Sequence, residues 1–415
     1  MRIAIIAPSA MPSRRANTIQ TAKMAQAFTR LSHNVHLIAP SIHPPRQASF
    51  PSPHTSGASG ALTGEGDFWQ SFAHHYGLAT PFQISPLRSI PAFKRYDFAL
   101  RAILLAYQWH ADLIYTRLPQ AAALASLLGI NTIFEIHDFP QGRAATWLKL
   151  FLHGKGASRL VTITHALARS LQAAFPQIPA SAQPPQTNPF LIIAADGVDL
   201  ERYTPWLTPD QARQQLQEKG FPLPDQFTAG YTGHLYAGRG VDLIFQLAQQ
   251  LPEVYFLLVG GEEADRQNWQ KTKDKLNLSN VFLHGFVPNA ELPPYQMACH
   301  ALLMPYQEQV AASSGGDIAD YLSPMKLFEY LASGRPILAS DLAVFHEILN
   351  EENAILLPPQ DLDAWVKALT ELRASPQKRE HLSQSARQSA QKYSWEERAH
   401  HILSTGTQSD IESHL

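Results

Sequence analysis

A lysine near the start of a predicted helix is the first sign of chemistry in this chain. Residues 323–340, "SPMKLFEYLASGRPILAS", read as a short helix that ends at Gly334 and continues into a buried strand. Ser323 is the predicted cap and Pro324 the first helical residue. Lys326 then falls in the first turn, where a cation opposes the helix dipole. A phosphate bound at the helix N-terminus would explain this lysine.

The same helix carries a glutamate on the side of the lysine. At 100° per residue, Lys326, Glu329, Tyr330 and Ser333 share one polar face, and the other face is apolar. The simpler interpretation is a solvated surface with one Lys–Glu pair, which adds only about 0.2–0.5 kcal/mol. The residues alone leave both interpretations open.

A second candidate for phosphate binding is a glycine-rich loop between a strand and a helix. Residues 231–244 read "YTGHLYAGRGVDLI", with Arg239 between two glycines, Gly238 and Gly240. Glycines allow a close approach of the backbone, and an arginine can bind phosphate oxygens with two N–H groups. The loop is neither a Walker motif nor a G-x-G-x-x-G fingerprint. A turn with a surface arginine remains the alternative.

A third stretch repeats the arrangement of strand, glycines and helix. Residues 257–265 read "LLVGGEEAD". In doubly wound sheets ligands bind beyond the carboxyl ends of the strands, where these glycine turns lie. Three such ends in one half of the chain favour a nucleotide-like ligand.

Two sets of alternating strands and helices must position these residues. The predicted strands of the first half are 2–7, 35–39, 112–116, 132–136, 160–164 and 191–195. Those of the second half are 227–232, 254–259, 281–284, 301–305, 336–340 and 354–358. This alternation is typical of α/β proteins with parallel sheets, and each half has enough strands for its own doubly wound sheet.

Breaks in composition mark the borders of these halves. Residues 40–66 and 176–189 are rich in Pro, Ser and Gly and are predicted as loops. The domain boundary is placed near residue 203, which gives an N-terminal domain over 1–203 and a C-terminal domain over 204–392. A last helical segment over 393–415 contains Trp395 at helical spacing with Ala399 and Ile402.

Composition restricts the class of protein further. The chain has 415 residues and one cysteine, Cys299, and no run of 18 uncharged apolar residues, so neither an internal disulfide nor a membrane-spanning helix is expected. Residues 1–200 hold 16 Lys and Arg against 8 Asp and Glu, whereas residues 201–415 hold 17 against 27. This division is either drift in composition between two domains or a sign that the basic half meets an anionic membrane surface or a phosphorylated acceptor. A cytoplasmic protein, peripheral at the inner membrane face, is the expectation, with no nucleic-acid partner.

Taken together, these stretches resemble the glycosyltransferase family 4 type of the GT-B superfamily. The likeness spans nearly the whole chain. It is strongest over "SPMKLFEYLASGRPILAS", good over "GYTGHLYAGRGVDLI", "NVFLHGFV" and "ALLMPY", and looser over "EIHD", "ADGVDLERY" and "YSWEERA". The resemblance implies two Rossmann-like doubly wound domains facing a central cleft, and a C-terminal helix that crosses back to the first domain.

The resemblance also implies roles for individual residues. Lys326 and Arg239 would bind the donor diphosphate, and Glu329 would bind the donor ribose. His137, in "EIHD", would lie near the transferred sugar; without the resemblance it is a polar residue at a strand end. The remaining residues expected around the donor are Gly233, His234, Asp320, Tyr321 and Leu327.

Two positions depart from the family pattern. Many members show Glu-x7-Glu, but Tyr321 stands where the first glutamate would be, and Asp317 or Asp320 would have to replace it. The loop after the first strand, "PSAMPSRRANT", lacks the usual glycine pair and offers Arg14, Arg15 and Asn17 instead. The contacts to donor sugar and acceptor therefore depend on residues that the family pattern does not supply.

The expected activity is a retaining transfer of a sugar from a UDP- or GDP-sugar to a glycan, a lipid or another acceptor. Two cations at the phosphates would stabilise the leaving group, so neither a metal nor another cofactor is expected. "HALAR" and "HEIL" lack the spacing of a His-Glu-x-x-His site. The alternatives are a nucleotide-sugar epimerase of the same fold and a silent nucleotide-sugar-binding protein. A dehydrogenase is disfavoured, because both halves lack G-x-G-x-x-G.

Overall fold

The computed structural model describes residues 1–41, 65–178, 190–311 and 317–404. By its internal contacts the chain divides into two units. Unit 1 contains Met1–Asp196 together with Trp395–Leu415, and unit 2 contains Gly197–Ser394. The chain thus passes into unit 2 at Gly197, a few residues before the boundary placed near residue 203. Most of the loop predicted over 40–66 and most of the one over 176–189 lie outside the described residues.

Unit 1 is built on a parallel sheet with the strand order β3-β2-β1-β4-β5-β6-β7. Its strands are β1 (Arg2–Ile6), β2 (Asn34–Ser41), β3 (Gln83–Arg88), β4 (Leu113–Thr116), β5 (Thr132–Ile136), β6 (Ala157–Thr162) and β7 (Leu191–Ile193). Its α-helices are α1 (Ala16–Arg30), α2 (Glu65–Tyr76), α3 (Tyr96–Gln108), α4 (Pro119–Leu127), α5 (Arg143–His153), α6 (His165–Ala174) and α14 (Trp395–Leu403).

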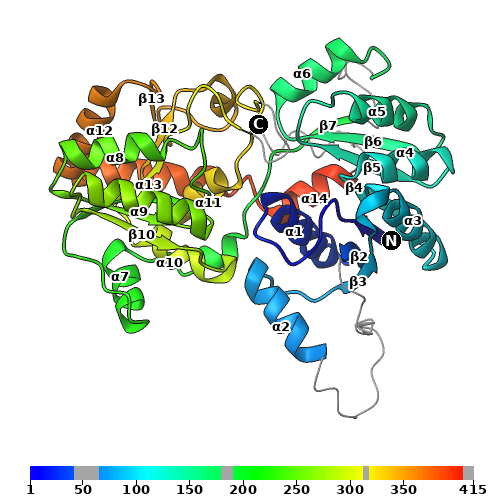
Figure 1. Cartoon of the computed structure of the whole chain (residues 1–415), viewed down its shortest axis with the longest axis horizontal. Helices are drawn as coiled ribbons and strands as arrows, with labels where there is room; N and C mark the ends of the chain where they lie inside the picture. The colour runs from blue at the N-terminus through cyan, green and yellow to red at the C-terminus, as the bar shows by residue number, and fades with distance from the viewer. Residues whose placement is uncertain (42–64, 179–189, 312–316, 405–415) are drawn as a thin grey trace. The chain divides into compact units, whose positions relative to one another are not determined.

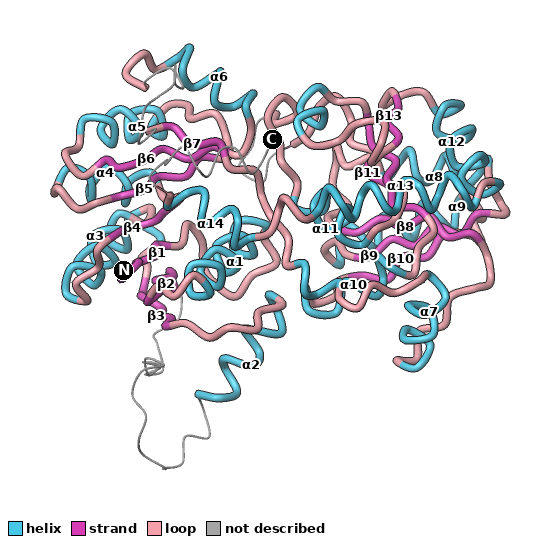
Figure 2. The backbone as a smooth tube through the Cα atoms, turned by 180° about the vertical axis from the view of Figure 1, so that it is seen from behind, coloured by secondary structure: helices cyan, strands magenta, loops and turns pink. Residues whose placement is uncertain are grey.

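The helices of unit 1 cover both faces of the sheet. α3, α4 and α5 follow one another along one face, and α1 packs against α14 on the other (Figures 1 and 2). The core below α3 and α4 contains Ile6, Ile38, Phe98 and Ile114. The sheet is therefore buried on both sides, which agrees with the continuous apolar runs of its central strands.

Unit 2 repeats this plan with the parallel strand order β10-β9-β8-β11-β12-β13. Its strands are β8 (Phe227–Thr232), β9 (Val254–Val259), β10 (Val281–Gly285), β11 (Ala301–Met304), β12 (Ile337–Ser340) and β13 (Ile355–Leu357). Its α-helices are α7 (Pro209–Glu218), α8 (Val241–Gln250), α9 (Glu263–Lys275), α10 (Leu292–Met297), α11 (Met325–Ser333), α12 (Leu362–Ala374) and α13 (Pro376–Ala390). α8 contacts α12, and α11 contacts α13 (Figure 1).

The structure confirms all twelve predicted strands and adds β3, which the sequence did not indicate. β3 contains Pro86 and the polar residues Gln83 and Ser85, and it pairs only with β2 at the edge of the sheet. A proline inside a run argues against a central strand but is tolerated at an edge. The missing ladder partner on one side explains why such a weak strand pattern suffices.

The start of α11 corrects the sequence-based helix boundary. Ser323 was predicted as the cap, but the helix begins at Met325 and Pro324 is its N-cap, with extended angles of φ −76° and ψ 127°. No side chain caps this helix end. Proline fixes only φ, so its ψ is free to be extended. The first N–H groups of α11 are thus without a capping side chain.

The C-terminal helix belongs to unit 1, as the resemblance predicts. α14 lies against α1, and Arg30 Nη1 pairs with Glu396 Oε1 at 2.7 Å. Arg159 donates a hydrogen bond to the carbonyl oxygen of Ile402. In the described part of the chain, no helix is both long enough and apolar enough to span a membrane.

Candidate functional site

The carboxyl ends of the strands of unit 2 bring the three glycine-rich stretches to one edge of the sheet. Gly233 follows β8, and its N–H donates to the carbonyl oxygen of Val259 at 2.9 Å. Gly260 follows β9 with φ 119°, and a Cβ there would lie 2.4 Å from the carbonyl oxygen of Gly233. Only glycine fits this crossing of two loops.

The loop before α8 is held equally closely. Gly240 is the N-cap of α8 with φ 74°, and a Cβ there would lie 1.6 Å from the carbonyl oxygen of Pro305, after β11. Gly238 packs against the backbone of Gln309. Arg239, between these two glycines, is therefore fixed by its neighbours and points its side chain toward two tyrosines.

Arg239 and Lys326 lie around a common group of aromatic rings. The guanidinium carbon of Arg239 is 4.9 Å from the ring centre of Tyr236 and 5.0 Å from that of Tyr306. The ammonium nitrogen of Lys326 is 3.8 Å from the ring centre of Tyr231 and 5.4 Å from that of Tyr306. Two cations thus flank Tyr306, at the same end of the sheet.

The ammonium group of Lys326 is buried without a partner. Among the described residues it has no hydrogen-bond acceptor. A Cβ on Gly233 would come within 2.8 Å of the nitrogen, so the lysine lies directly against this glycine. Burial, followed by the nearby charge of Arg239, lowers the pKa of Lys326 well below its usual value, although Glu329 acts in the opposite direction. A buried charge of this kind needs an anionic partner.

The positive charges of Lys326 and Arg239 also act on His234. Burial, then Lys326 and Arg239, lower its pKa, and Glu262 and Asp265 oppose this shift. The backbone carbonyl of His234 accepts a hydrogen bond from Tyr231 Oη at 2.6 Å. His234 therefore belongs to the wall of the cationic site as a neutral side chain.

Glu329 lies one turn further along α11 and is oriented by two amides. Gln296 Nε2 donates to its Oε2 at 3.1 Å, and Asn289 Nδ2 approaches its Oε1 at 3.4 Å. Gln296 is itself fixed by Thr232 at 3.1 Å and by Tyr203 Oη, which donates to Gln296 Oε1 at 2.6 Å. The carboxylate is held in place while each oxygen retains a lone pair for a ligand.

The face of α11 that carries Lys326 and Glu329 is not a solvated surface. Tyr330 and Ser333 are fully buried. Tyr330 Oη accepts a hydrogen bond from the N–H of Thr232 at 2.8 Å, and Ser333 Oγ donates to the carbonyl of Tyr330 at 2.7 Å. The simpler interpretation, an exposed Lys–Glu pair, is therefore wrong.

The other predicted donor residues of unit 2 lie in different surroundings. Leu327 is 1% exposed and belongs to the core, with its N–H bonded to the carbonyl of Pro324. Tyr321 donates from Oη to the carbonyl of Asp317 at 3.1 Å. Asp317 Oδ1 accepts from the N–H groups of Val310 and Ala319 at 2.8 and 3.0 Å, which lower the pKa of this carboxyl. Asp320 is exposed.

His137 belongs to unit 1, where it follows β5. Its Nε2 contacts Glu135 Oε1, and Glu135 is fully buried. Arg398 on α14 pairs with the same carboxylate at 3.0 Å, and Gln20 Nε2 donates to it at 2.7 Å. Burial alone would raise the pKa of Glu135, but Arg398 and His137 outweigh it and hold the pKa well below its usual value.

Glu135, His137 and Asp196 place three potential metal ligands within 4.8 Å of one another, the one such group in the described residues. Asp196 Oδ1 has no hydrogen-bond partner there, and burial raises the pKa of Asp196. However, the guanidinium group of Arg398 already neutralises Glu135, and a divalent cation beside it would be repelled. The arrangement fits an ion-pair network better than a metal centre.

Sequence reasoning missed the tyrosines and amides of unit 2. Tyr231, Tyr306, Asn289 and Gln296 come from separate strands, loops and helices, and only the strand order brings them together. "GYTGHLYAGRG" and "ALLMPY" did contain both tyrosines, next to glycines and a strand end, which is the one signal that could have indicated them.

The comparisons agree with this geometry. Residues 226–375 match the family described as glycosyl transferases group 1. The chain is 26% identical to a D-inositol 3-phosphate glycosyltransferase of Xylanimonas cellulosilytica over 219 residues, which cover 51% of this chain and 49% of that protein. The chain thus matches only about half the length of this curated relative.

Solved structures match over nearly the whole chain. Sucrose-phosphate synthase from Thermosynechococcus elongatus has a TM-score of 0.68 at 18% identity, with 97% of each chain covered. HepE from Anabaena, in complex with UDP and glucose, has a TM-score of 0.66 at 16% identity, covering 100% of this chain and 99% of that one. At this identity the likeness concerns the fold. Residues 226–375 thus match the group 1 glycosyl transferases, in a chain whose fold is that of these solved glycosyltransferase-like structures.

Proposed function

We propose that the protein transfers a sugar from a nucleoside diphosphate sugar to an acceptor. The observation that carries this proposal is the ammonium group of Lys326, which is buried beside Arg239 and has no hydrogen-bond partner among the described residues. A diphosphate supplies the anionic oxygens that both cations lack. The N-terminus of α11, which no side chain caps, also favours a phosphate at the same place.

These cations would act on the leaving group. As the bond between the sugar C1 and the diphosphate oxygen breaks, negative charge grows on that oxygen, and Lys326 and Arg239 neutralise it. The acceptor oxygen forms the new bond to C1, and its proton passes to the departing phosphate oxygen. A transfer on one face in this way retains the anomeric configuration and needs neither a carboxylate nucleophile nor a metal. Preorganised cations of this kind lower the barrier by about 3 kcal/mol each.

The other residues would bind the donor. Glu329, held by Gln296 and Asn289, would accept hydrogen bonds from the ribose hydroxyls. Gly233 and His234 would line the phosphates, and Asp317 or Asp320 would replace the missing glutamate at the sugar, beside Tyr321. The side chain of Leu327 is buried, so this residue would act only through its backbone in the first turn of α11. His137, oriented by Glu135, would act near the transferred sugar.

The relatives favour UDP as the nucleotide. HepE has been solved with UDP and with UDP-glucose. A UDP-sugar is therefore the first donor to test, and a GDP-sugar the second.

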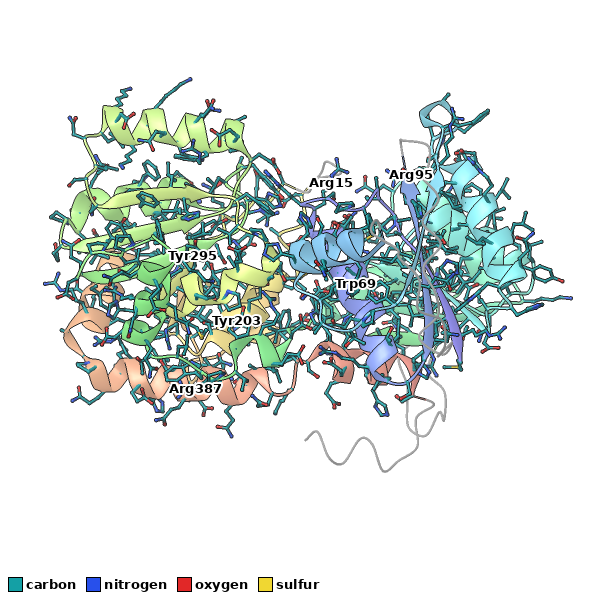
Figure 3. All side chains as sticks on the ribbon, turned by 90° about the horizontal axis from the view of Figure 1, so that it is seen from below. Arg15, Trp69, Arg95, Tyr203, Tyr295 and Arg387 are labelled. Carbon is teal, nitrogen blue, oxygen red and sulfur yellow. The ribbon has the colours of Figure 1, made fainter. Side chains whose placement is uncertain are left out.

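An acceptor with an anionic group fits unit 1. Arg15 follows the loop after β1, and Arg95 precedes α3; both are labelled in Figure 3. Burial, followed by the positive charge of Arg15, lowers the pKa of Arg95, so the two side chains feel each other's charge. The curated relative is named for a phosphorylated acceptor. We therefore propose a phosphorylated glycan or lipid-linked acceptor.

Ligand-induced stabilisation tests the donor assignment. UDP, GDP and ADP are compared by thermal unfolding, and UDP at 100 times its dissociation constant should stabilise the protein by about 2.7 kcal/mol. Lys326→Met should lose this stabilisation, whereas Lys367→Met on the exposed side of α12 should keep it. Stabilisation by UDP that is equal in the wild type and Lys326→Met would contradict the assignment.

Product analysis separates the alternatives. A transferase gives UDP and a glycosylated acceptor, an epimerase of the same fold gives an altered sugar without an acceptor product, and a silent binding protein leaves the donor intact. Activity that persists in the presence of a chelator is the expected result for a metal-independent reaction. Loss of activity that only added metal restores would contradict the metal-independent reaction.

A further inference from the structure

Large apolar side chains are exposed mainly on one face of unit 1. Of the eleven such residues in the described part of the chain, seven lie on α3, α4 and α5, directly after α4, or in the turn before α3. They are Phe93, Leu100, Leu104, Tyr107, Leu127, Leu128 and Leu150, with exposed fractions from 37% to 70%. We call these residues and the helices that carry them the α3–α5 face. A concentration of this kind marks an interaction surface.

α3 shows that these side chains are not core residues left slightly open. Phe98, Ala102 and Ala106 are fully buried against the sheet, as the inner side of an amphipathic helix should be. Leu100, Leu104 and Tyr107 form a second apolar stripe on the outer side, at spacings of four and three residues. No described element of unit 1 covers this stripe, because all three residues are at least 54% exposed.

The three helices form one continuous surface. α3 contacts α4, and α4 contacts α5 (Figure 1). The rings of Tyr96 on α3 and Trp147 on α5, both partly exposed, are 5.8 Å apart. Tyrosine and tryptophan with a partly wet ring are typical of the boundary between water and lipid headgroups.

The charges on the α3–α5 face have one predominant sign. Lys94, Arg143 and Lys149 are exposed on the turn before α3 and on α5. The only acidic residue within α3, α4 and α5 is Asp97, whose Oδ2 pairs with Arg101 and accepts the N–H of Ile90. Exposed apolar residues beside uncompensated basic ones complement an anionic lipid surface.

A second copy of the chain is a poorer partner for this face. A two-fold dimer would place the face against an identical face, so that the basic residues Lys94, Arg143 and Lys149 would meet an equally basic surface. Like charges across an interface are repulsive, and the face offers no free carboxylate to pair with them.

We propose that the α3–α5 face docks onto the surface of an anionic lipid bilayer, with its apolar residues among the acyl chains and its basic residues at the headgroups. The proposal is independent of the transferase activity and identifies which part of the basic N-terminal half would make the contact. Combined with that activity, it would bring unit 1 to an acceptor presented in a membrane.

Vesicle sedimentation tests the proposal without any nucleotide sugar. The full chain should bind vesicles that contain phosphatidylglycerol at low salt and be released from them at high salt. It should not bind vesicles of phosphatidylcholine alone. Each basic residue near such a surface contributes a factor of about 5, so Arg143→Gln with Lys149→Gln should weaken binding about 25-fold. Leu100→Gln with Leu104→Gln should reduce binding at least as much.

Control residues lie on and directly after α9 of unit 2, where Lys271, Lys275 and Leu276 are also exposed. Lys271→Gln with Lys275→Gln, and Leu276→Gln, should sediment like the wild type. Thermal unfolding with and without UDP checks that all variants are folded and keep the donor site. If the protein binds UDP but does not bind vesicles, the membrane proposal is wrong and the proposed function is unaffected.

Three results would overturn the docking proposal. The first is a wild-type protein that does not sediment with phosphatidylglycerol vesicles at low salt. The second is that the α9 variants weaken binding as strongly as those of the α3–α5 face. The third is a wild-type dimer in light scattering that Leu100→Gln with Leu104→Gln converts to a monomer, which would assign the face to a second copy.

Discussion

Lys326 carries a positive charge at a place where the described residues of unit 2 offer it aromatic rings and a second cation but no acceptor. Such a charge lowers the stability of the empty protein. Lys326→Met should therefore keep or raise the melting temperature without ligand while it lowers turnover by about 100-fold or more, the typical loss for one transition-state partner. Steady-state kinetics and thermal unfolding of the same preparations measure both effects. Equal losses of stability and activity would point to a purely structural lysine.

The depressed pKa of Lys326 also predicts a pH dependence. Its folded pKa lies below the unfolded value, so the unfolded chain binds more protons in the interval between the two. Below this interval the penalty for burying the charge is fully present, and it disappears as the pH rises through the interval. The free energy of unfolding of the ligand-free protein should thus increase with pH more steeply in the wild type than in Lys326→Met. Denaturant titrations at several pH values measure it, and identical slopes would argue against a buried ammonium.

The residues that sequence reasoning identified share a visible signal. Lys326 is a cation in the first turn of its helix, where the helix dipole disfavours it, and Arg239 lies between two glycines. Both unusual positions can be recognised from the sequence alone. Asn289 and Gln296 have no such signal, because an amide is ordinary at any surface and gains its role only through the fold. The side chain of Leu327 lies in the core, so its burial could not be read from its place in the motif.

At the scale of elements, α14 is tied to the sheet of unit 1 by one buried ion pair. Arg398 also donates to the carbonyl oxygens of Ala195 and Ala194, at 2.8 and 3.2 Å. Arg398→Ala would remove the guanidinium partner of the buried Glu135, and breaking a buried ion pair typically costs about 3–5 kcal/mol. Urea unfolding should show this loss, and Arg398→Met combined with Glu135→Gln should recover at least half of it. No recovery in the double variant would mean that the guanidinium acts through packing instead.

Elements were easier to predict than their borders. The central strands are apolar on both faces, so their sequences need no alternation to be recognised. β3 was missed because proline usually argues against a strand, although an edge strand tolerates it. The start of α11 was misplaced because proline is common at the first helical position but can also be the residue just before the helix. Only the pairing of β3 with β2, and the angles of Pro324, decide these two cases.

At the scale of the whole molecule, unit 2 is a continuous stretch with its own sheet and core. The fragment Gly197–Ser394 should therefore fold by itself and bind UDP with an affinity within about tenfold of that of the full chain, since every described residue of the cationic site lies within it. Circular dichroism and calorimetry with UDP measure both properties. An unfolded fragment would show that unit 2 needs unit 1 to fold. A folded fragment that does not bind UDP would show that donor binding needs residues of unit 1.

The place of α14 in unit 1 has a consequence for the newly made chain. Val198 and Ser394 form a β-bridge, so the segments that enter and leave unit 2 run side by side. Unit 2 is thus an insertion of 198 residues between the body of unit 1 and its last helix. A ribosome adding about 5–20 residues per second needs about 10–40 s to cross it. During that delay Glu135 has no Arg398, so unit 1 must wait, unfinished, for a helix that is synthesised after unit 2 has already had time to fold.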